Sequence, residues 1–130
     1  MSRPVTLFTG QWADLSFEEI CKKASEWGYD GLEIACWGDH MVPEKGASDM
    51  DYISDKLEIL KKYDLQCHAL GAHLAGQCVG DDWDERLDSF APDKVKGNPE
   101  EVRKWATQEM INTAKAAKNM GCYVVTGFLD

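Results

Sequence analysis

The sequence has few basic residues and no long apolar run, and each shortage excludes a class of partner. Its 130 residues include 14 Lys and Arg against 23 Asp and Glu, which gives a formal charge of −9. Nucleic-acid backbones are bound by basic surfaces, so we expect no nucleic-acid partner. The longest apolar runs, such as residues 121–129, are far shorter than the roughly 20 residues that a membrane-spanning helix needs. We therefore expect no membrane partner either.

Several motifs of known chemistry are also missing from the chain. No GxGxxG follows the first apolar run, and there is no P-loop, GxSxG or HExxH motif. These absences argue against dinucleotide, P-loop nucleotide and serine-hydrolase sites. The five cysteines are odd in number and form no CxxC pair, which is typical of reduced thiols. Because no signal peptide is recognisable either, the sequence predicts a cytoplasmic protein.

The chain has an ordinary globular composition, and short apolar runs alternate along it with helical patterns. Four runs predict strands, at residues 5–9, 31–36, 65–70 and 122–126. Capping and stop residues predict three helices between them: Ser16 with Glu19 to Gly28, Ser48 or Asp49 onward, and Asn98 with Pro99 to Gly121. This alternation predicts the α/β class, with parallel βα units in a single domain over residues 1–130.

Residues 71–97 are the one long stretch without a clear pattern. The segment follows the carboxyl end of a predicted strand, where parallel sheets place their ligand sites. It also carries the acidic run Asp81–Glu85, and an acidic run of this kind is more often a solvated surface loop. Composition favours a surface loop, and a ligand-binding loop is kept as the alternative interpretation.

Polar residues interrupt or follow the predicted strands. Glu33 lies inside the second strand, where burying an unpaired charge costs several kcal/mol. It is either a substrate ligand or proton-transfer carboxylate, or a structural carboxylate paired with backbone or a cation. His73 follows the third strand between Gly71 and Gly76, where a side chain can reach a pocket. His68, inside the third strand, is more simply a structural histidine.

Other candidates come from the turns after the strands. Trp12 and Trp37 each follow a strand and could form an apolar wall for a sugar ring, although packing is the default role of tryptophan. His40 lies in a turn, where a lone histidine is usually only solvated. Asp130 follows the fourth strand. Glu33, Asp39, His40 and His73 are suitable ligand types for a divalent ion, but their spacing predicts no metal site.

Four segments of the chain resemble one known family. Residues 5–15, 27–40, 73–77 and 121–128 resemble the sugar phosphate isomerase/epimerase family, the xylose-isomerase-like TIM barrels, and Gly28-Tyr-Asp-Gly-Leu-Glu33 is the most specific piece. The resemblance implies a (β/α)8 barrel with a divalent metal, commonly Mn, Mg or Co. In that family the ion polarises a sugar carbonyl while carboxylates move a proton on the adjacent carbon.

The chain departs from the family in length. A full barrel needs about 250 residues and eight strands, whereas four strands are predicted in 130 residues. The family's metal ligands and catalytic carboxylates come from the second half, so the resemblance assigns no catalytic residue and no metal ligand here. It implies a sugar-facing lining made by Glu33 and His73, and less securely by Trp12, Trp37 and His40.

The resulting expectation is the first half, with four strands, of a (β/α)8 TIM barrel from a metal-dependent sugar or sugar phosphate isomerase or epimerase. The abrupt stop after the fourth strand suggests an N-terminal fragment without turnover of its own. Exposed strand edges predict a homo-oligomer. Two alternatives stay open: a stand-alone flavodoxin-like binding or regulatory module, and a non-catalytic subunit that supplies half a barrel to another polypeptide. Glu33 and His68 favour a barrel interior, because open parallel sheets carry continuous apolar strands.

Overall fold

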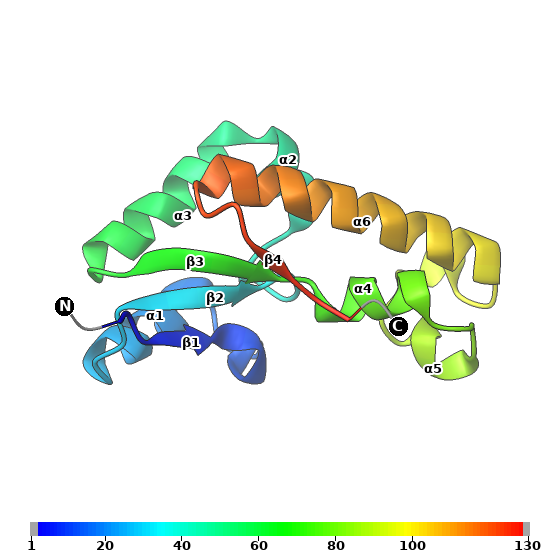
Figure 1. Cartoon of the computed structure of the whole chain (residues 1–130), viewed down its shortest axis with the longest axis horizontal. Helices are drawn as coiled ribbons and strands as arrows, with labels where there is room; N and C mark the ends of the chain where they lie inside the picture. The colour runs from blue at the N-terminus through cyan, green and yellow to red at the C-terminus, as the bar shows by residue number, and fades with distance from the viewer. Residues whose placement is uncertain (1–2, 129–130) are drawn as a thin grey trace.

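A computed structural model, which describes residues 3–128, contains four parallel strands that pair in the order of the chain (Figure 1). The strands are β1 (Thr6–Phe8), β2 (Gly31–Ala35), β3 (Gln66–Gly71) and β4 (Val125–Thr126). Helices connect them, so the predicted α/β class with parallel βα units is confirmed. No helix within residues 3–128 is long and apolar enough to cross a membrane.

The three predicted helices begin at the capping residues that the sequence indicates, whereas the shorter helices were not predicted. They are α1 (Phe17–Glu26), α2 (Pro43–Ser48), α3 (Met50–Lys62), α4 (His73–Gly80), α5 (Glu85–Asp88) and α6 (Pro99–Met120), with 3-10 helices η1 (Thr9–Trp12) and η2 (Asp93–Val95). Ser16 and Glu19 form the predicted capping box of α1, and Asn98 caps α6. Asp49, rather than Ser48, caps α3, because Ser48 ends the unpredicted helix α2.

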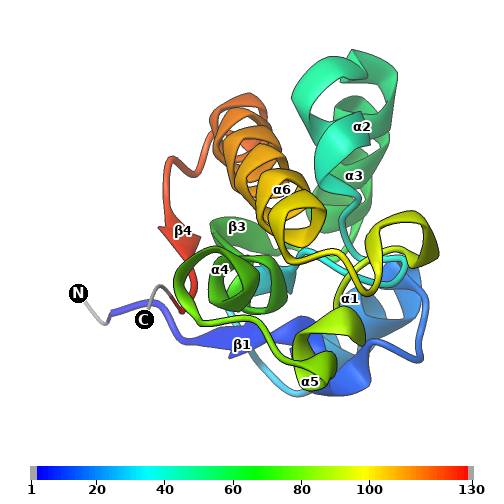
Figure 2. The ribbon, with the colours of Figure 1, turned by 90° about the vertical axis from the view of Figure 1, so that its right-hand side faces the viewer.

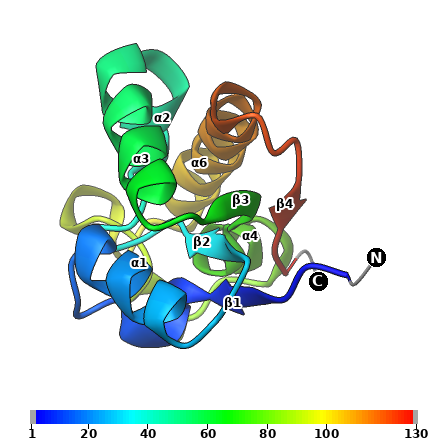
Figure 3. The same ribbon diagram turned by 90° about the vertical axis from the view of Figure 1, so that its left-hand side faces the viewer.

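The sheet is wound in one direction only. Each strand pairs with the next one in sequence, and right-handed crossovers between such strands place every connecting helix on the same face. In Figure 3 the sheet curves from β1 to β4, and α1, α3 and α6 all lie on its convex side. A doubly wound sheet instead reverses its strand order and carries helices on both faces. The described residues therefore do not have a flavodoxin-like arrangement.

The hydrophobic core lies between the convex face and the helices. Alternate residues of the strands point into it, among them Leu32, Ile34 and Leu70, and they pack against Phe17 and Ile20 of α1. All five side chains are at most 1% exposed. Since neighbouring residues of a strand point to opposite faces, this alternation turns the residues between them toward the concave face.

The prediction of an irregular loop over residues 71–97 is wrong. This stretch contains α4, α5 and η2, and α4 lies at the carboxyl ends of the strands (Figure 2). It forms a second apolar cluster with the first half of α6, made by Cys78, Leu87, Ala91, Val95, Val102 and Ala106. Its apolar residues are spaced too irregularly to show a period, because each short helix buries only one or two of them.

The fourth strand is shorter than the predicted 122–126. The backbone N–H groups of Cys122 and Tyr123 both donate to the carbonyl of Ala117, which holds them at the end of α6. Tyr123 also has a φ of 58°, a left-handed conformation that interrupts an extended strand. Only Val125 and Thr126 remain to pair with β3, so one edge of the sheet is very short.

Candidate functional site

The carboxyl ends of the four strands bring a small group of side chains together on the concave face. Phe8 of β1 is paired in register with Glu33 of β2, and Gly71 of β3 is paired with Thr126 of β4. All four residues lie at or near the ends of their strands, where parallel α/β sheets bind their ligands. We call these residues, together with His73 and Phe128, the concave cluster.

Glu33 reaches across a neighbouring strand. Its carboxylate Oε1 accepts a hydrogen bond from the Thr126 hydroxyl, although the two residues are 93 positions apart and β3 lies between their strands. On β3 the intervening residues are Ala69 and Gly71, whose small side chains leave room for this contact. Glu33 is half-buried, so the hydrogen bond offsets part of the cost of holding a carboxylate there.

His73 forms the second polar element of the cluster. It is the first residue of α4, and its imidazole lies between two aromatic rings, 5.3 Å from Phe8 and 4.8 Å from Phe128 by ring centroids. Its Nδ1 atom is buried and has no hydrogen-bond partner within residues 3–128. A buried ring nitrogen of this kind needs a polar partner. The His73 Nδ1 atom can therefore accept a hydrogen bond from a ligand group or donate one to it.

Trp37 forms an aromatic wall beside the cluster. Its indole meets the Phe8 ring edge to face at 5.8 Å between centroids. Trp37 also lines a cavity of about 140 Å³ that extends toward α4 and α6. The structure therefore places three of the five predicted lining residues, Glu33, His73 and Trp37, around one aromatic residue, Phe8.

The structure does not bring Trp12 and His40 to this cluster. Trp12 packs on the convex side, against the hydrophobic core and 5.7 Å from Trp27. His40 is completely buried, its Nδ1 lies 2.8 Å from Thr9 Oγ1, and its Nε2 lies 3.0 Å from the carbonyl oxygen of Leu15. With both ring nitrogens engaged, His40 is a structural residue rather than a solvated one, and we leave both residues out of the candidate site.

Comparisons with known proteins do not identify the family of this chain. No family model matches the chain, and no curated protein matches it either. The side chains present must therefore indicate the chemistry of the site. Within residues 3–128, no group of three His, Cys, Asp or Glu side chains is arranged to hold a metal ion. The donor set of the concave cluster, one carboxylate with one imidazole, does not fit a metal centre, and we derive no step through one.

His68 lies on the concave face too, where sequence reasoning gave it only a structural role. The pairing of β2 with β3 shifts register between Leu32 and Glu33, which leaves His68 as the extra residue of a β-bulge. Its Nε2 is buried without a hydrogen-bond partner in the described part of the chain. Gly31 makes room for the ring, since a Cβ there would lie 2.4 Å from His68 Cδ2. A bulge cannot be read from the sequence of β3 alone.

Thr126, Phe8 and Phe128 are further members of the site that sequence reasoning missed. Phe8 and Thr126 belong to predicted strands and Phe128 to a predicted apolar run, so each has an ordinary packing role from sequence alone. Their common position, at the strand ends, is the signal that could have found them. Asp130, the polar residue noted after the fourth strand, lies outside the described residues.

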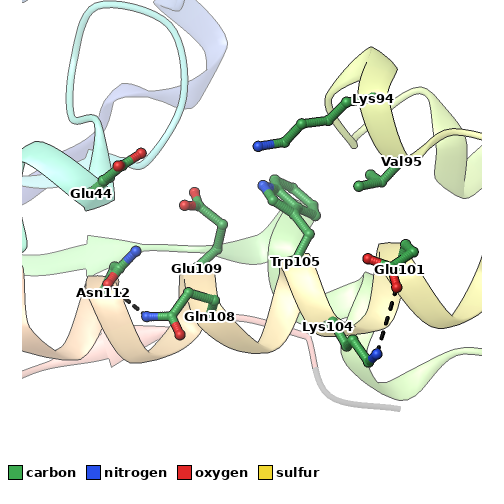
Figure 4. Close-up of a pocket in the computed structure, with 9 residues that line it drawn as sticks. All are labelled: Glu44, Lys94, Val95, Glu101, Lys104, Trp105, Gln108, Glu109 and Asn112. Atoms are coloured by element: carbon green, nitrogen blue, oxygen red, sulfur yellow. Dashed lines mark hydrogen bonds and ion pairs between the residues drawn. The ribbon is translucent and has the colours of Figure 1, made fainter.

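A second cavity, of about 520 Å³, lies over α6 (Figure 4). Lys94, Trp105 and Glu109 turn toward the same space, with Glu44 on its opposite side. Burial raises the pKa of Glu109, and the charge of Glu44 raises it further, whereas a hydrogen bond with Asn112 lowers it. Trp105 and Glu109 also line the smaller cavity beside Trp37, but neither belongs to the concave cluster, so Glu109 provides a control glutamate for Glu33.

We expect Gly71→Ala to distort the concave cluster and to destabilise the fold. A Cβ on Gly71 would lie 2.8 Å from the Phe8 ring, and 3.5 Å from both His73 Nε2 and Thr126 Oγ1. Overpacking of this kind typically costs about 1–3 kcal/mol. Urea unfolding measures the loss of stability. Gly97→Ala is a poor control, because Gly97 has a φ of 79°, a left-handed conformation that alanine adopts with strain. Ala69→Gly is a better one, since it adds no atoms to the same face; an unchanged unfolding midpoint for Gly71→Ala would contradict the expected clash.

We expect the buried histidine His40 to lower the free energy of unfolding at acidic pH. Burial lowers its pKa below the usual 6.5, and the charge of Lys56 lowers it further, although hydrogen bonding to Leu15 and the charge of Asp39 oppose this. As the pH falls through 6.5, the unfolded chain takes up a proton that folded His40 refuses, so stability is lost toward low pH. From pH 7.5 to 5.5 the loss from one such group is at most about 1.4 kcal/mol.

The measurement is the free energy of unfolding in urea at both pH values, for the wild type and for His40→Gln. The variant should be less stable at pH 7.5, and its stability should change less between the two pH values. An equal pH dependence in the two proteins would show that His40 does not contribute to it.

Proposed function

We propose that this chain forms the first four strands of a xylose-isomerase-like (β/α)8 barrel and binds a sugar or sugar phosphate on its concave face. The observation that carries the proposal is Glu33, a carboxylate held at the carboxyl end of the sheet on the face that α1, α3 and α6 leave open. A singly wound parallel sheet with a polar concave face has the geometry of a barrel wall. The family resemblance of the surrounding residues supports the same assignment.

The concave cluster has the two kinds of group that a sugar requires. Glu33, Thr126 and His73 offer a carboxylate, a hydroxyl and an imidazole nitrogen that can form hydrogen bonds with sugar hydroxyls. Phe8, Phe128 and Trp37 offer aromatic surface for the apolar C–H face of the ring. Polar groups set among aromatic side chains are typical of small-molecule sites.

The parent activity that we propose is isomerisation or epimerisation, which moves a proton on a carbon next to a carbonyl. A carboxylate such as Glu33 can accept hydrogen bonds from substrate hydroxyls or take up a proton. In the proposed family a divalent metal (Mn, Mg or Co) stabilises the oxygen that becomes charged. Within residues 3–128 no three His, Cys, Asp or Glu side chains are grouped so that they could hold that ion, and we propose that this chain alone binds substrate without turning it over.

The binding experiment is saturation-transfer NMR of the 130-residue chain with a panel of ketoses, aldoses and their phosphates. At least one member should receive saturation through the aromatic residues of the concave cluster, and Thr126→Val should weaken that signal. No binding by any member would overturn the sugar assignment. The turnover experiment follows deuterium uptake next to the carbonyl in D₂O with Mn²⁺, and uptake by the chain alone would contradict the claim of inactivity.

We also propose self-association, because the sheet ends in two edges, β1 and β4, whose strands have unpaired backbone sides. A second copy of the chain, or another polypeptide with the missing strands, would cover the open concave face. Light scattering should therefore give the mass of a dimer or a larger assembly. A monomer that melts cooperatively would contradict self-association, and a pull-down from source cells distinguishes a heterologous partner. The five free thiols favour a reducing compartment such as the cytoplasm.

A further inference from the structure

A buried lysine holds the turn that carries Trp37. Lys56 belongs to α3, and its side chain is only 6% exposed, although lysine is rarely buried without a partner. Its Nζ atom donates a 2.7 Å hydrogen bond to the backbone carbonyl oxygen of Asp39. Asp39 lies in residues 36–42, which connect β2 to α2 and which we call the β2 turn. A charged group of α3 is therefore bonded to the backbone of this turn.

Two aromatic rings enclose the ammonium group of Lys56. Its Nζ atom lies 4.2 Å from the centroid of the Phe17 ring and 5.1 Å from that of the Tyr52 ring. At such distances the face of an aromatic ring attracts an ammonium group. The residues that the structure describes form no ion pair with Lys56. Its charge is therefore stabilised by these rings and by the carbonyl group of Asp39.

Further hydrogen bonds tie the β2 turn to the helices on the convex side. The Asp39 carboxylate accepts a 2.9 Å hydrogen bond from the backbone N–H of Phe17, the first residue of α1. At the far end of the turn, the Tyr52 hydroxyl accepts a hydrogen bond of the same length from the backbone N–H of Val42. The turn is therefore held by α1 at one point and by α3 at two, through Lys56 and Tyr52.

Trp37 lies in the same turn, and its indole forms the aromatic wall beside the concave cluster. The indole meets the Phe8 ring at 5.8 Å between centroids. Gly10 leaves room for both rings, since a Cβ there would lie 2.5 Å from the Phe8 ring and 2.7 Å from Trp37 Cζ2. Only Gly38, with a φ of 62°, separates Trp37 from Asp39. A displacement of the Asp39 carbonyl would therefore be passed on to the backbone that carries the indole.

We propose that Lys56 is a positioning residue for the candidate site: its ammonium group, with the Tyr52 hydroxyl beside it, fixes the β2 turn and thereby the direction of the Trp37 indole. An apolar side chain of similar length would fill the same space without the cost of burying a charge. Only a donor, however, can satisfy the carbonyl of Asp39. The role of Trp37 in sugar binding rests on the proposed function, whereas the control of its position by Lys56 does not.

The test is fluorine NMR of the whole chain labelled with fluorotryptophan, in which Trp37→Phe assigns the Trp37 signal among those of the five tryptophans. Lys56→Met keeps the length of the side chain but removes its donor and charge, and it should shift the Trp37 signal by more than the linewidth. Lys56→Arg keeps a charged donor and should leave the signal closer to its wild-type position. With the sugar found in the NMR panel, Lys56→Met should weaken binding about two- to tenfold, the loss expected from one aromatic contact.

Two controls separate positioning from a general loss of stability. Lys45→Met removes an exposed lysine whose Nζ lies 5.9 Å from the centroid of the Tyr52 ring, and Ile53→Val truncates a buried residue of α3; neither should move the Trp37 signal. The proposal is overturned if Lys56→Met leaves that signal in place, or if Ile53→Val shifts it as far.

A variant that does not fold would not remove the test. Should Lys56→Met fail to fold, Tyr52→Phe, which removes only the hydroxyl at the far end of the β2 turn, must shift the Trp37 signal, and an unchanged signal would overturn the proposal. The fluorine signal needs no ligand, so it is informative even if no sugar binds. A shifted Trp37 signal with unchanged sugar affinity would contradict the proposed sugar wall and leave the role of Lys56 intact.

Discussion

Replacing Ile34 by alanine is expected to lower the free energy of unfolding by about 2–5 kcal/mol. Ile34 lies in β2, a central strand of the sheet, and its side chain is 0% exposed between the sheet and the helices. It pairs in register with Leu70 of β3, another fully buried residue of the same core. Truncation would leave a cavity that strands held on both sides cannot close, so the cost should lie toward the upper part of this range.

The matched control for this prediction is Ile111→Ala. Ile111 lies on α6 and is 45% exposed, and alanine is the better helix former, so this change should alter stability by less than about 0.5 kcal/mol. Urea denaturation followed by circular dichroism measures both variants. Similar losses for the two isoleucines would mean that the core does not lie where the structure places it.

Replacing Glu33 by glutamine is expected to weaken binding of the sugar found in the NMR panel by at least tenfold. The amide keeps the size of the side chain and can still accept a hydrogen bond from Thr126, so the fold should be retained. What it removes is the negative charge. Hydrogen bonds to charged groups contribute about 1.5–3 kcal/mol, and about 1.4 kcal/mol corresponds to a tenfold change in affinity.

Glu109→Gln is the matched control for Glu33→Gln. It makes the same substitution at another half-buried glutamate, but in the cavity over α6 rather than in the concave cluster. NMR titrations of the two variants against the wild type measure the affinities. The concave site is supported if only Glu33→Gln loses affinity, and it is contradicted if both variants bind as the wild type does or if Glu109→Gln loses more.

Much of the fold follows from short-range patterns in the sequence. The caps at Ser16 and Asn98 and the stop at Gly121 are local signals, because each depends on residues within one helical turn. The four strands are predicted because each is an apolar run bounded by polar or glycine residues. Their alternation with helices is enough to predict a parallel sheet. The segment 71–97 is the exception, since its short helices are stabilised mainly by burial against α6.

The candidate site is only partly visible in the sequence. Glu33 and His73 are conspicuous because they are polar residues inside or directly after apolar strands. Trp12 and His40 have the same signal, but the fold turns both toward the convex side. The direction of a side chain after a strand ends depends on the path of the turn, which local pattern does not determine.

Local sequence patterns were enough to predict the α/β class, the bounds of β1, β2, β3, α1 and α6 to within two residues, and two polar residues of the site, Glu33 and His73. The single winding of the sheet and the contact of Glu33 with Thr126 across β3 became apparent only in the folded chain. The physical reason is distance along the chain. Caps and periodic patterns act over a few residues, whereas Glu33 and Thr126 are 93 positions apart and meet only once β2, β3 and β4 have paired.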